Sequence, residues 1–190
     1  MLLSRRQIEI RGGFIVSQTP DIGLLEGVVA PRILEAMRAA SSRLKGLGIS
    51  HALVGALGVG AHGYPRATKD VDFLVGDEAF QHHAGGLVSL TAGVPIQVGD
   101  VPVDPLSMRP DEPHLRDALA QAVVSGGVPV APLEALVYLK LKSPRRRDAA
   151  DIVELLRVVR RPDGIRDYLT AHAPSLVERF DELAAEAQDQ

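Results

Sequence analysis

The longest regular pattern in the chain is an amphipathic stretch over residues 29–47. Apolar residues recur there at steps of three and four, which is the period of one face of a helix. Gly48 follows the last of them and is typical of a helix end. The pattern predicts a helix whose apolar face consists of Val29, Ile33, Met37, Ala40, Leu44 and Leu47.

Short apolar runs bounded by turn residues predict the strands. They cover residues 49–54, 71–75, 94–98, 101–106 and 128–130. Gly99-Asp100 separates the third run from the fourth and is a hairpin turn signal. Between the strands we expect short helices over 55–63, 78–90 and 114–120, and a brief alternation over 7–16, around Arg11-Gly12-Gly13, suggests a further hairpin.

From residue 132 the pattern is helical. Pro132 suits the first turn of a helix, and Pro144, Pro162 and Pro174 divide the remainder into several helices. The whole pattern predicts an α/β (α+β) fold: a small mixed β-sheet flanked by helices, followed by a helical C-terminal part. We expect an α/β core over 1–131 and a helical region over 132–190 that packs on or beside it.

Composition narrows the class of protein. The chain has 190 residues, 46% of them hydrophobic and 24% charged, as in an ordinary globular domain. The lack of cysteine excludes disulfides and cysteine nucleophiles. No apolar run approaches the roughly 18 residues of a membrane span, and the N-terminus does not resemble a signal peptide, so we expect a cytoplasmic protein without membrane association.

Charge and histidine spacing limit the chemistry further. The net charge of −3 argues against a generally basic nucleic-acid-binding surface, so a polyanion would have to meet local patches such as Arg145–Arg147. Several histidines show no paired metal-ligand spacing, and no chemistry is assigned to them; these are His51, His82, His83, His114 and His172.

Asp70-Val71-Asp72 opens one of the apolar runs that predict a strand. Because side chains alternate along a strand, Asp70 and Asp72 lie on one face and Val71 lies on the other. Two carboxylates held side by side repel unless one is protonated or a cation lies between them. Hard oxygen ligands with no neighbouring His or Cys favour Mg²⁺ or Mn²⁺. A strand end with two exposed acids stays open as the alternative.

Two further positions give this pair a context. Gly55-Ala56 follow the strand expected at 49–54 and lack bulky side chains, so a phosphate chain could approach the backbone there. Tight packing would explain the same small residues. Asp104 lies in an otherwise apolar strand, where its charge requires a metal ion, a basic side chain or solvent at the strand end.

In these features the chain resembles the nucleotidyltransferase superfamily, and specifically its small prokaryotic members related to the toxins of AbiE-type abortive-infection systems. Their signature is a hydrophobic strand ending in Gly-Gly or Gly-Ser, a hydrophobic-flanked Asp-x-Asp or Asp-x-Glu, and a third carboxylate on a later strand. Gly55-Ala56, Asp70 with Asp72, and Asp104 match it, and 62–69 resembles the His-Gly, Arg and Thr pattern of these members. The resemblance covers about residues 29–159, and Ala56 departs from it, since the family has Gly or Ser there.

Two basic residues join the candidate site. Arg66, in the loop before the Asp-x-Asp strand, could reach a triphosphate or be an exposed loop charge. Lys140 projects from an apolar helix face and must meet an anion or extend to solvent. Asp148 and Asp151 on the next helix could receive it in a purely structural ion pair. The resemblance implies instead that Lys140 and Asp151 are functional.

The combined interpretation is a Mg²⁺-dependent nucleotidyltransferase that transfers a nucleoside monophosphate from an NTP to an acceptor. Asp70, Asp72 and Asp104 are expected to bind the metal, with Mn²⁺ as an alternative ion. The nucleotide is expected to contact Gly55, Ala56, Arg66 and Lys140. The resemblance implies an RNA acceptor, such as a tRNA 3′ end, and a cognate antitoxin. The alternatives are an antibiotic-modifying nucleotidyltransferase and a non-catalytic domain of the same fold.

Overall fold

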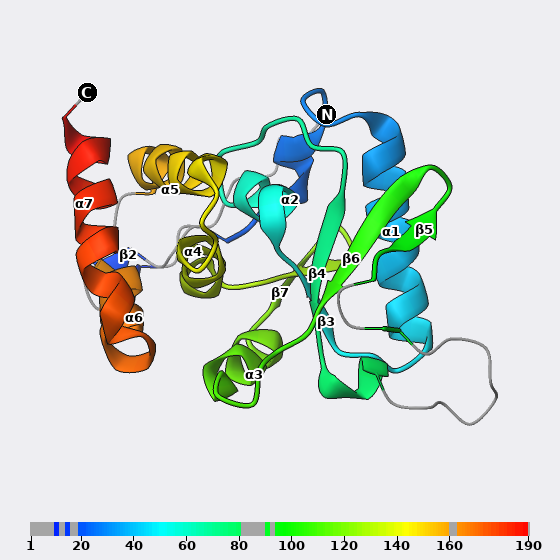
Figure 1. The fold of residues 1–190 in the computed structure, drawn as a ribbon. Coiled ribbons are helices and arrows are strands. Elements are labelled where there is room, and N and C mark those ends of the chain that lie inside the picture. The colour runs from blue at the N-terminus through cyan, green and yellow to red at the C-terminus, as the bar shows by residue number, and fades with distance from the viewer. Residues whose placement is uncertain are drawn as a thin grey trace.

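A six-stranded mixed sheet lies at the centre of the fold, between its helices (Figure 1). The computed structural model describes residues 10–11, 14–15, 19–80, 90–91, 94–159 and 163–189. The strand order across the sheet is β5-β6-β4-β3-β8-β7. The strands are β3 (His51–Leu53), β4 (Val71–Val75), β5 (Ile96–Val98), β6 (Val101–Leu106), β7 (Val123–Ser125) and β8 (Val128–Val130).

The strand pairings decide which side chains share a face. β4 is antiparallel to β3 and parallel to β6, and β3 is parallel to β8. β5–β6 and β7–β8 are antiparallel pairs at the two edges. In the parallel β4–β6 pair, Asp72 lies directly opposite Asp104, so the two carboxylates project from the same face of the sheet.

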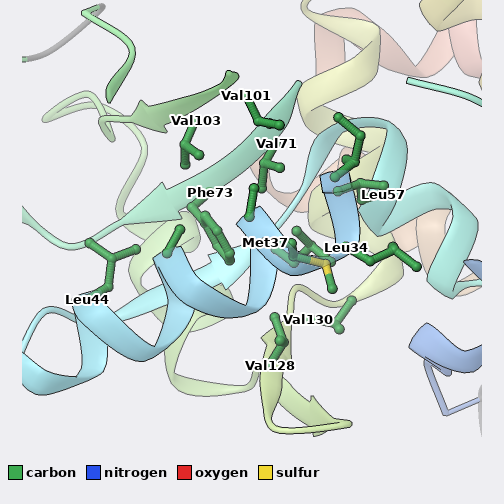
Figure 2. Packing of buried hydrophobic residues seen from close by; sticks show 14 of the residues in the cluster. Leu34, Met37, Leu44, Leu57, Val71, Phe73, Val101, Val103, Val128 and Val130 are labelled. Carbon is green, nitrogen blue, oxygen red and sulfur yellow. The ribbon is translucent and has the colours of Figure 1, made fainter. Parts of the chain in front are cut away.

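One face of the sheet packs against α1 (Pro31–Gly46). Val71 and Phe73 of β4 join Met37 and Leu44 of α1 in this layer (Figure 2), and all four are almost fully buried. Val71 and Phe73 alternate with Asp72 along β4, so Asp72 lies on the opposite face. The α1 layer therefore fixes the side of the sheet to which the acid points.

The opposite face packs against the C-terminal helices. Ala52, Val54 and Leu74 of the sheet belong to one hydrophobic cluster with Leu136 and Ile152. The helices of this layer are α3 (Pro113–Ala120), α4 (Leu133–Leu141), α5 (Arg146–Val158), α6 (Asp163–His172) and α7 (Val177–Gln188). Side chains from 1–131 and from 132–190 thus share one core, and the division at residue 131 stays a prediction.

The fold class expected from the sequence is confirmed, with local differences. The first long helix begins at Pro31 rather than at Val29, and strand β7 was not expected because its valines are exposed. Of the helix expected at 78–90, the structure describes a short 3₁₀ helix, η2 (Asp77–Phe80), while residues 81–89 lie outside the described residues. The remaining elements are β1 (Ile10–Arg11), β2 (Phe14–Ile15), η1 (Ile22–Leu25), α2 (Gly55–Ala61) and η3 (Pro174–Leu176).

A helix that spans a membrane has to be both long and predominantly apolar. Within the described ranges, no helix combines the length and the apolar character that a membrane span requires.

Candidate active site

The three predicted metal ligands come from the start of β4 and from the neighbouring strand β6. Asp72 and Asp104 are direct partners in the β4–β6 register. Asp70 lies one residue before β4, and its carboxylate accepts a hydrogen bond from the Thr68 hydroxyl. The structure therefore brings together two acids that are 32 positions apart in the sequence, because the parallel pairing of β4 with β6 sets them side by side.

The electrostatics of this cluster show uncompensated negative charge. Burial and then the charges of Asp70 and Asp104 raise the pKa of Asp72, which reaches about 6 against the opposing charges of Lys140 and Arg145. The pKa of Asp104 is also raised, first by burial and then by Asp70. Since each acid disfavours the ionised form of its neighbour, the cluster would be stabilised by an added cation.

Gly55 lies against the carboxylate of Asp72. Its φ is +61°, and a Cβ at this position would lie 1.8 Å from Oδ2 of Asp72. Only glycine leaves that space free, since any side chain would require Asp72 to move. Ala56, by contrast, is buried in α2. Of the two small residues expected to admit a phosphate chain, Gly55 is the one that directly borders the acids.

The chemistry of the donor set suits Mg²⁺, which prefers oxygen ligands and usually binds through one or two carboxylates, with water and substrate phosphates completing its shell. In the part of the chain that the structure describes, no three acidic, imidazole or thiol groups converge into a ready-made metal site. Asp72 and Asp104 fit the open type of site, in which the nucleotide supplies the remaining ligands.

Arg66 and Lys140 both pair with Asp151. Arg66 donates to the two carboxylate oxygens of Asp151 from Nε (2.6 Å) and Nη2 (2.7 Å). The Lys140 ammonium lies 2.5 Å from Oδ2 of Asp151 and 2.5 Å from Oδ1 of Asp148. Asp151 is only 2% exposed, and hydrogen bonds from Arg66 and Lys140 lower its pKa against the effect of burial. These contacts match the ion pair that the sequence left open; contact of Arg66 or Lys140 with a nucleotide stays a prediction.

Arg145 is a cation that faces the acids and that sequence reasoning did not separate from its neighbours. Its charge partly offsets the rise in the pKa of Asp72 and of Asp104. Among the described residues, its guanidinium has no ion-pair partner. Arg145 and Lys140 also line a cavity of about 450 Å³ between α4, α5 and α7, which Arg146 and Arg179 border as well. Two cations that act on the pKa of Asp72 thus also line this cavity, together with Glu186.

The comparisons with known proteins yield a distant structural likeness that carries no argument. No family model matches the sequence, and no curated protein matches it. A solved structure described as an antigenic nucleotidyltransferase-like protein from Paracoccidioides brasiliensis is 15% identical to this chain, with a TM-score of 0.47 over 85% of this chain and 95% of that one. A likeness of this degree carries no information about chemistry, which rests on the residues alone.

Proposed function

We propose that this chain is a Mg²⁺-dependent nucleotidyltransferase whose metal-binding residues are Asp70, Asp72 and Asp104. The observation that carries the proposal is the β4–β6 register, which sets Asp72 opposite Asp104 on one face of the sheet. The raised pKa of both acids and the space that Gly55 leaves beside Asp72 support it. Bound Mg²⁺ would neutralise charge on the triphosphate and on the leaving pyrophosphate.

The proposed reaction is transfer of a nucleoside monophosphate. The hydroxyl oxygen of the acceptor bonds to the α-phosphorus of an NTP, and the bond from that phosphorus to the oxygen bridging the α- and β-phosphates breaks. Pyrophosphate leaves, and the hydroxyl proton passes to Asp104. The carboxylate of Asp104, which the β4–β6 register holds beside Asp72, is the base in this proposal.

The basic residues have separate roles in this proposal. Arg145 contacts the triphosphate, because its charge faces both acids and no described carboxylate neutralises it. Lys140 and Arg66 are positioning residues: their bonds to Asp151 fasten the segment before β4 to α4 and α5, and the charge of Lys140 also lowers the pKa of Asp72. Ala56 provides no hydroxyl for the nucleotide, so the backbone next to Gly55 has to receive it.

For the acceptor we propose an RNA, as the resemblance to the AbiE-type toxins implies, together with a cognate antitoxin as partner. Arg145 and Arg146, which border the cavity beside α5, support an anionic acceptor, since phosphate groups would find two guanidinium groups there.

The test is NTP-dependent labelling of an acceptor. The full chain, Mg²⁺ and total tRNA are incubated with NTPs labelled on the α-phosphate and, in parallel, on the γ-phosphate. Nucleotidyl transfer leaves only the α-label on the RNA, whereas phosphoryl transfer would leave the γ-label. Asp72→Asn should reduce labelling by about a thousandfold or more, since it removes a ligand that acts in the transition state.

The controls separate chemistry from folding. Asp181→Asn changes an exposed acid on α7 and should keep full activity. Arg145→Ala should lower kcat/KM by about ten- to a hundredfold, while Arg43→Ala, an exposed arginine on α1, should leave it unchanged. Equal labelling by wild type and a folded Asp72→Asn variant would refute the proposal and favour a non-catalytic domain.

A further inference from the structure

A second cavity, of about 330 Å³, lies between α3, α4 and α6. It is remote from the acidic cluster along β4. Arg116 of α3 pairs with Asp77, two residues beyond the last residue of β4, whereas Asp70 and Asp72 lie at the beginning of that strand. Nothing in the proposed transfer reaction uses this cavity.

Two buried polar atoms without a partner belong to residues that line this cavity. His114 is only 5% exposed, and its Nε2 has no hydrogen-bond partner among the described residues; the same holds for the buried hydroxyl of Tyr168. His51 shows the contrast, because both of its ring nitrogens are engaged, by Ser41 and by the Ile49 carbonyl. Buried groups without a partner are rare because they are costly, so a ligand that reached these two atoms from the cavity would relieve the cost of both.

The cavity is electronegative. Asp117 and Glu134 line it, and neither has a cationic partner within the described ranges. Burial raises the pKa of the Tyr168 hydroxyl, and the charges of Glu134 and Asp117 raise it further, so this hydroxyl stays protonated beside two carboxylates. Burial lowers the pKa of His114, whose ring therefore stays neutral and able to accept a hydrogen bond at one nitrogen.

Aromatic rings form part of the wall. The rings of His114 and His172 are stacked, with centroids 4.8 Å apart and planes 19° apart. The ring of Tyr168 lies 4.7 Å from that of His172 and 5.6 Å from that of His114. Aromatic faces combined with carboxylates are the surroundings that proteins provide for organic ammonium groups.

We propose that this cavity is a binding site for a small organic ammonium ion, which pairs with Asp117 and Glu134, lies against the rings of Tyr168 and His172, and donates hydrogen bonds to Nε2 of His114 and to the hydroxyl oxygen of Tyr168. An alkyl diamine has the charge for both carboxylates and fits a cavity of this size. The proposal goes beyond the nucleotidyltransferase site, and its test does not depend on transfer activity.

The test is calorimetric titration of the full chain with 1,4-diaminobutane and, as a neutral analogue of the same length, butane-1,4-diol. We expect saturable binding of the diamine and none of the diol. Glu134→Gln and Asp117→Asn should each weaken binding by about tenfold or more, because each removes one charge partner. Glu35→Gln, which alters an exposed acid on α1, should bind as the wild type does.

Tyr168→Phe provides a variant that keeps the fold. It removes a buried hydroxyl that has no partner, so the variant should be at least as stable as the wild type while binding the diamine several-fold more weakly. In parallel, the imidazole NMR signals of His114 and His172 should shift on saturation with the diamine. The proposal is overturned if the diol binds equally well, if the diamine fails to bind at about 10 mM, or if its affinity survives both Glu134→Gln and Tyr168→Phe.

Discussion

Asp72 and Asp151 are the same kind of residue in two opposite settings. Asp151 has two cations as direct partners, Arg66 and Lys140, and its pKa is lowered although it is almost fully buried. Asp72 has two acids as its strongest charged neighbours, and its pKa is raised to about 6. Burial acts in the same direction on both residues, so the partners decide the difference.

The contrast separates an acid whose charge is paired within the chain from one whose charge is not. The charge of Asp151 is satisfied within the chain and holds the segment before β4 to the C-terminal helices. The acids around Asp72 are instead kept together by the β4–β6 register against their mutual repulsion. An arrangement that weakens the free protein in this way is expected where an external cation binds.

The largest effect should come from Asp151→Asn. It leaves Arg66 without its charge partner and Lys140 with Asp148 alone, so we expect a loss of about 3–5 kcal/mol of unfolding free energy, measured by urea denaturation. Asp181→Asn is the matched control, because Asp181 also binds both Nε and Nη2 of an arginine, Arg166, but in an exposed pair. It should change stability little, and equal losses in the two variants would contradict the contrast.

The pH dependence of Asp72 should have the opposite sign to that of a salt-bridged acid. Between pH about 4 and about 6 the native chain keeps a proton on Asp72 that the unfolded chain has released, so rising pH lowers stability across this window. The loss amounts to no more than about 3 kcal/mol. It is measured in EDTA as the difference between wild type and Asp72→Asn, which cancels the other titrating groups. Parallel pH profiles of the two proteins would disprove it.

Gly55→Ala should perturb the acids directly. The added methyl overlaps the Asp72 carboxylate, so this variant should lose about 2 kcal/mol more than Gly99→Ala. Gly99 is a matched control because its φ of +65° is nearly the same and nothing lies within 4 Å of its Cβ position. Thermal or urea unfolding of the two variants gives the comparison. Equal losses of unfolding free energy would show that the Asp72 carboxylate moves aside without destabilising the chain.

The smallest effect should be stabilisation by Mg²⁺. At about ten times the dissociation constant, a bound ion adds about 1.4 kcal/mol to the unfolding free energy. The wild type should therefore show a saturable rise in Tm with MgCl₂, and Asp72→Asn should not. KCl at matched ionic strength serves as the control for screening. A similar rise in both proteins would place the ion elsewhere on the chain.

Much of the architecture follows from local patterns. The recurrence of apolar residues at steps of three and four predicted α1, and Gly99-Asp100 predicted the turn between β5 and β6, where Gly99 has a positive φ. Strand β7 was missed because Val123 and Val124 are exposed at an edge, so no alternation of buried and polar residues marks them. Strand β7 forms by pairing with β8, which the local sequence pattern does not indicate.

The candidate site was only partly accessible from the sequence. The alternation in Asp70-Val71-Asp72 indicates a shared face, but only the parallel pairing of β4 with β6 sets Asp72 opposite Asp104. Arg145 could not be distinguished from Arg146 and Arg147, because which arginine faces the acids depends on where α5 begins. The stacking of His114 on His172 joins residues from α3 and α6 and leaves no sequence signal.

The β4–β6 register also sets which changes in chain length the site can accept. Side chains alternate with a period of two, so deletion of a single residue from Val101–Val103 would turn the carboxylate of Asp104 towards α1 and place an apolar side chain next to Asp72. Removal of two residues would restore the original face at the cost of a shorter strand. Insertions or deletions in β6 ahead of Asp104 therefore keep its carboxylate on the same face only when they change the strand by an even number of residues. This holds whichever apolar residues occupy those positions.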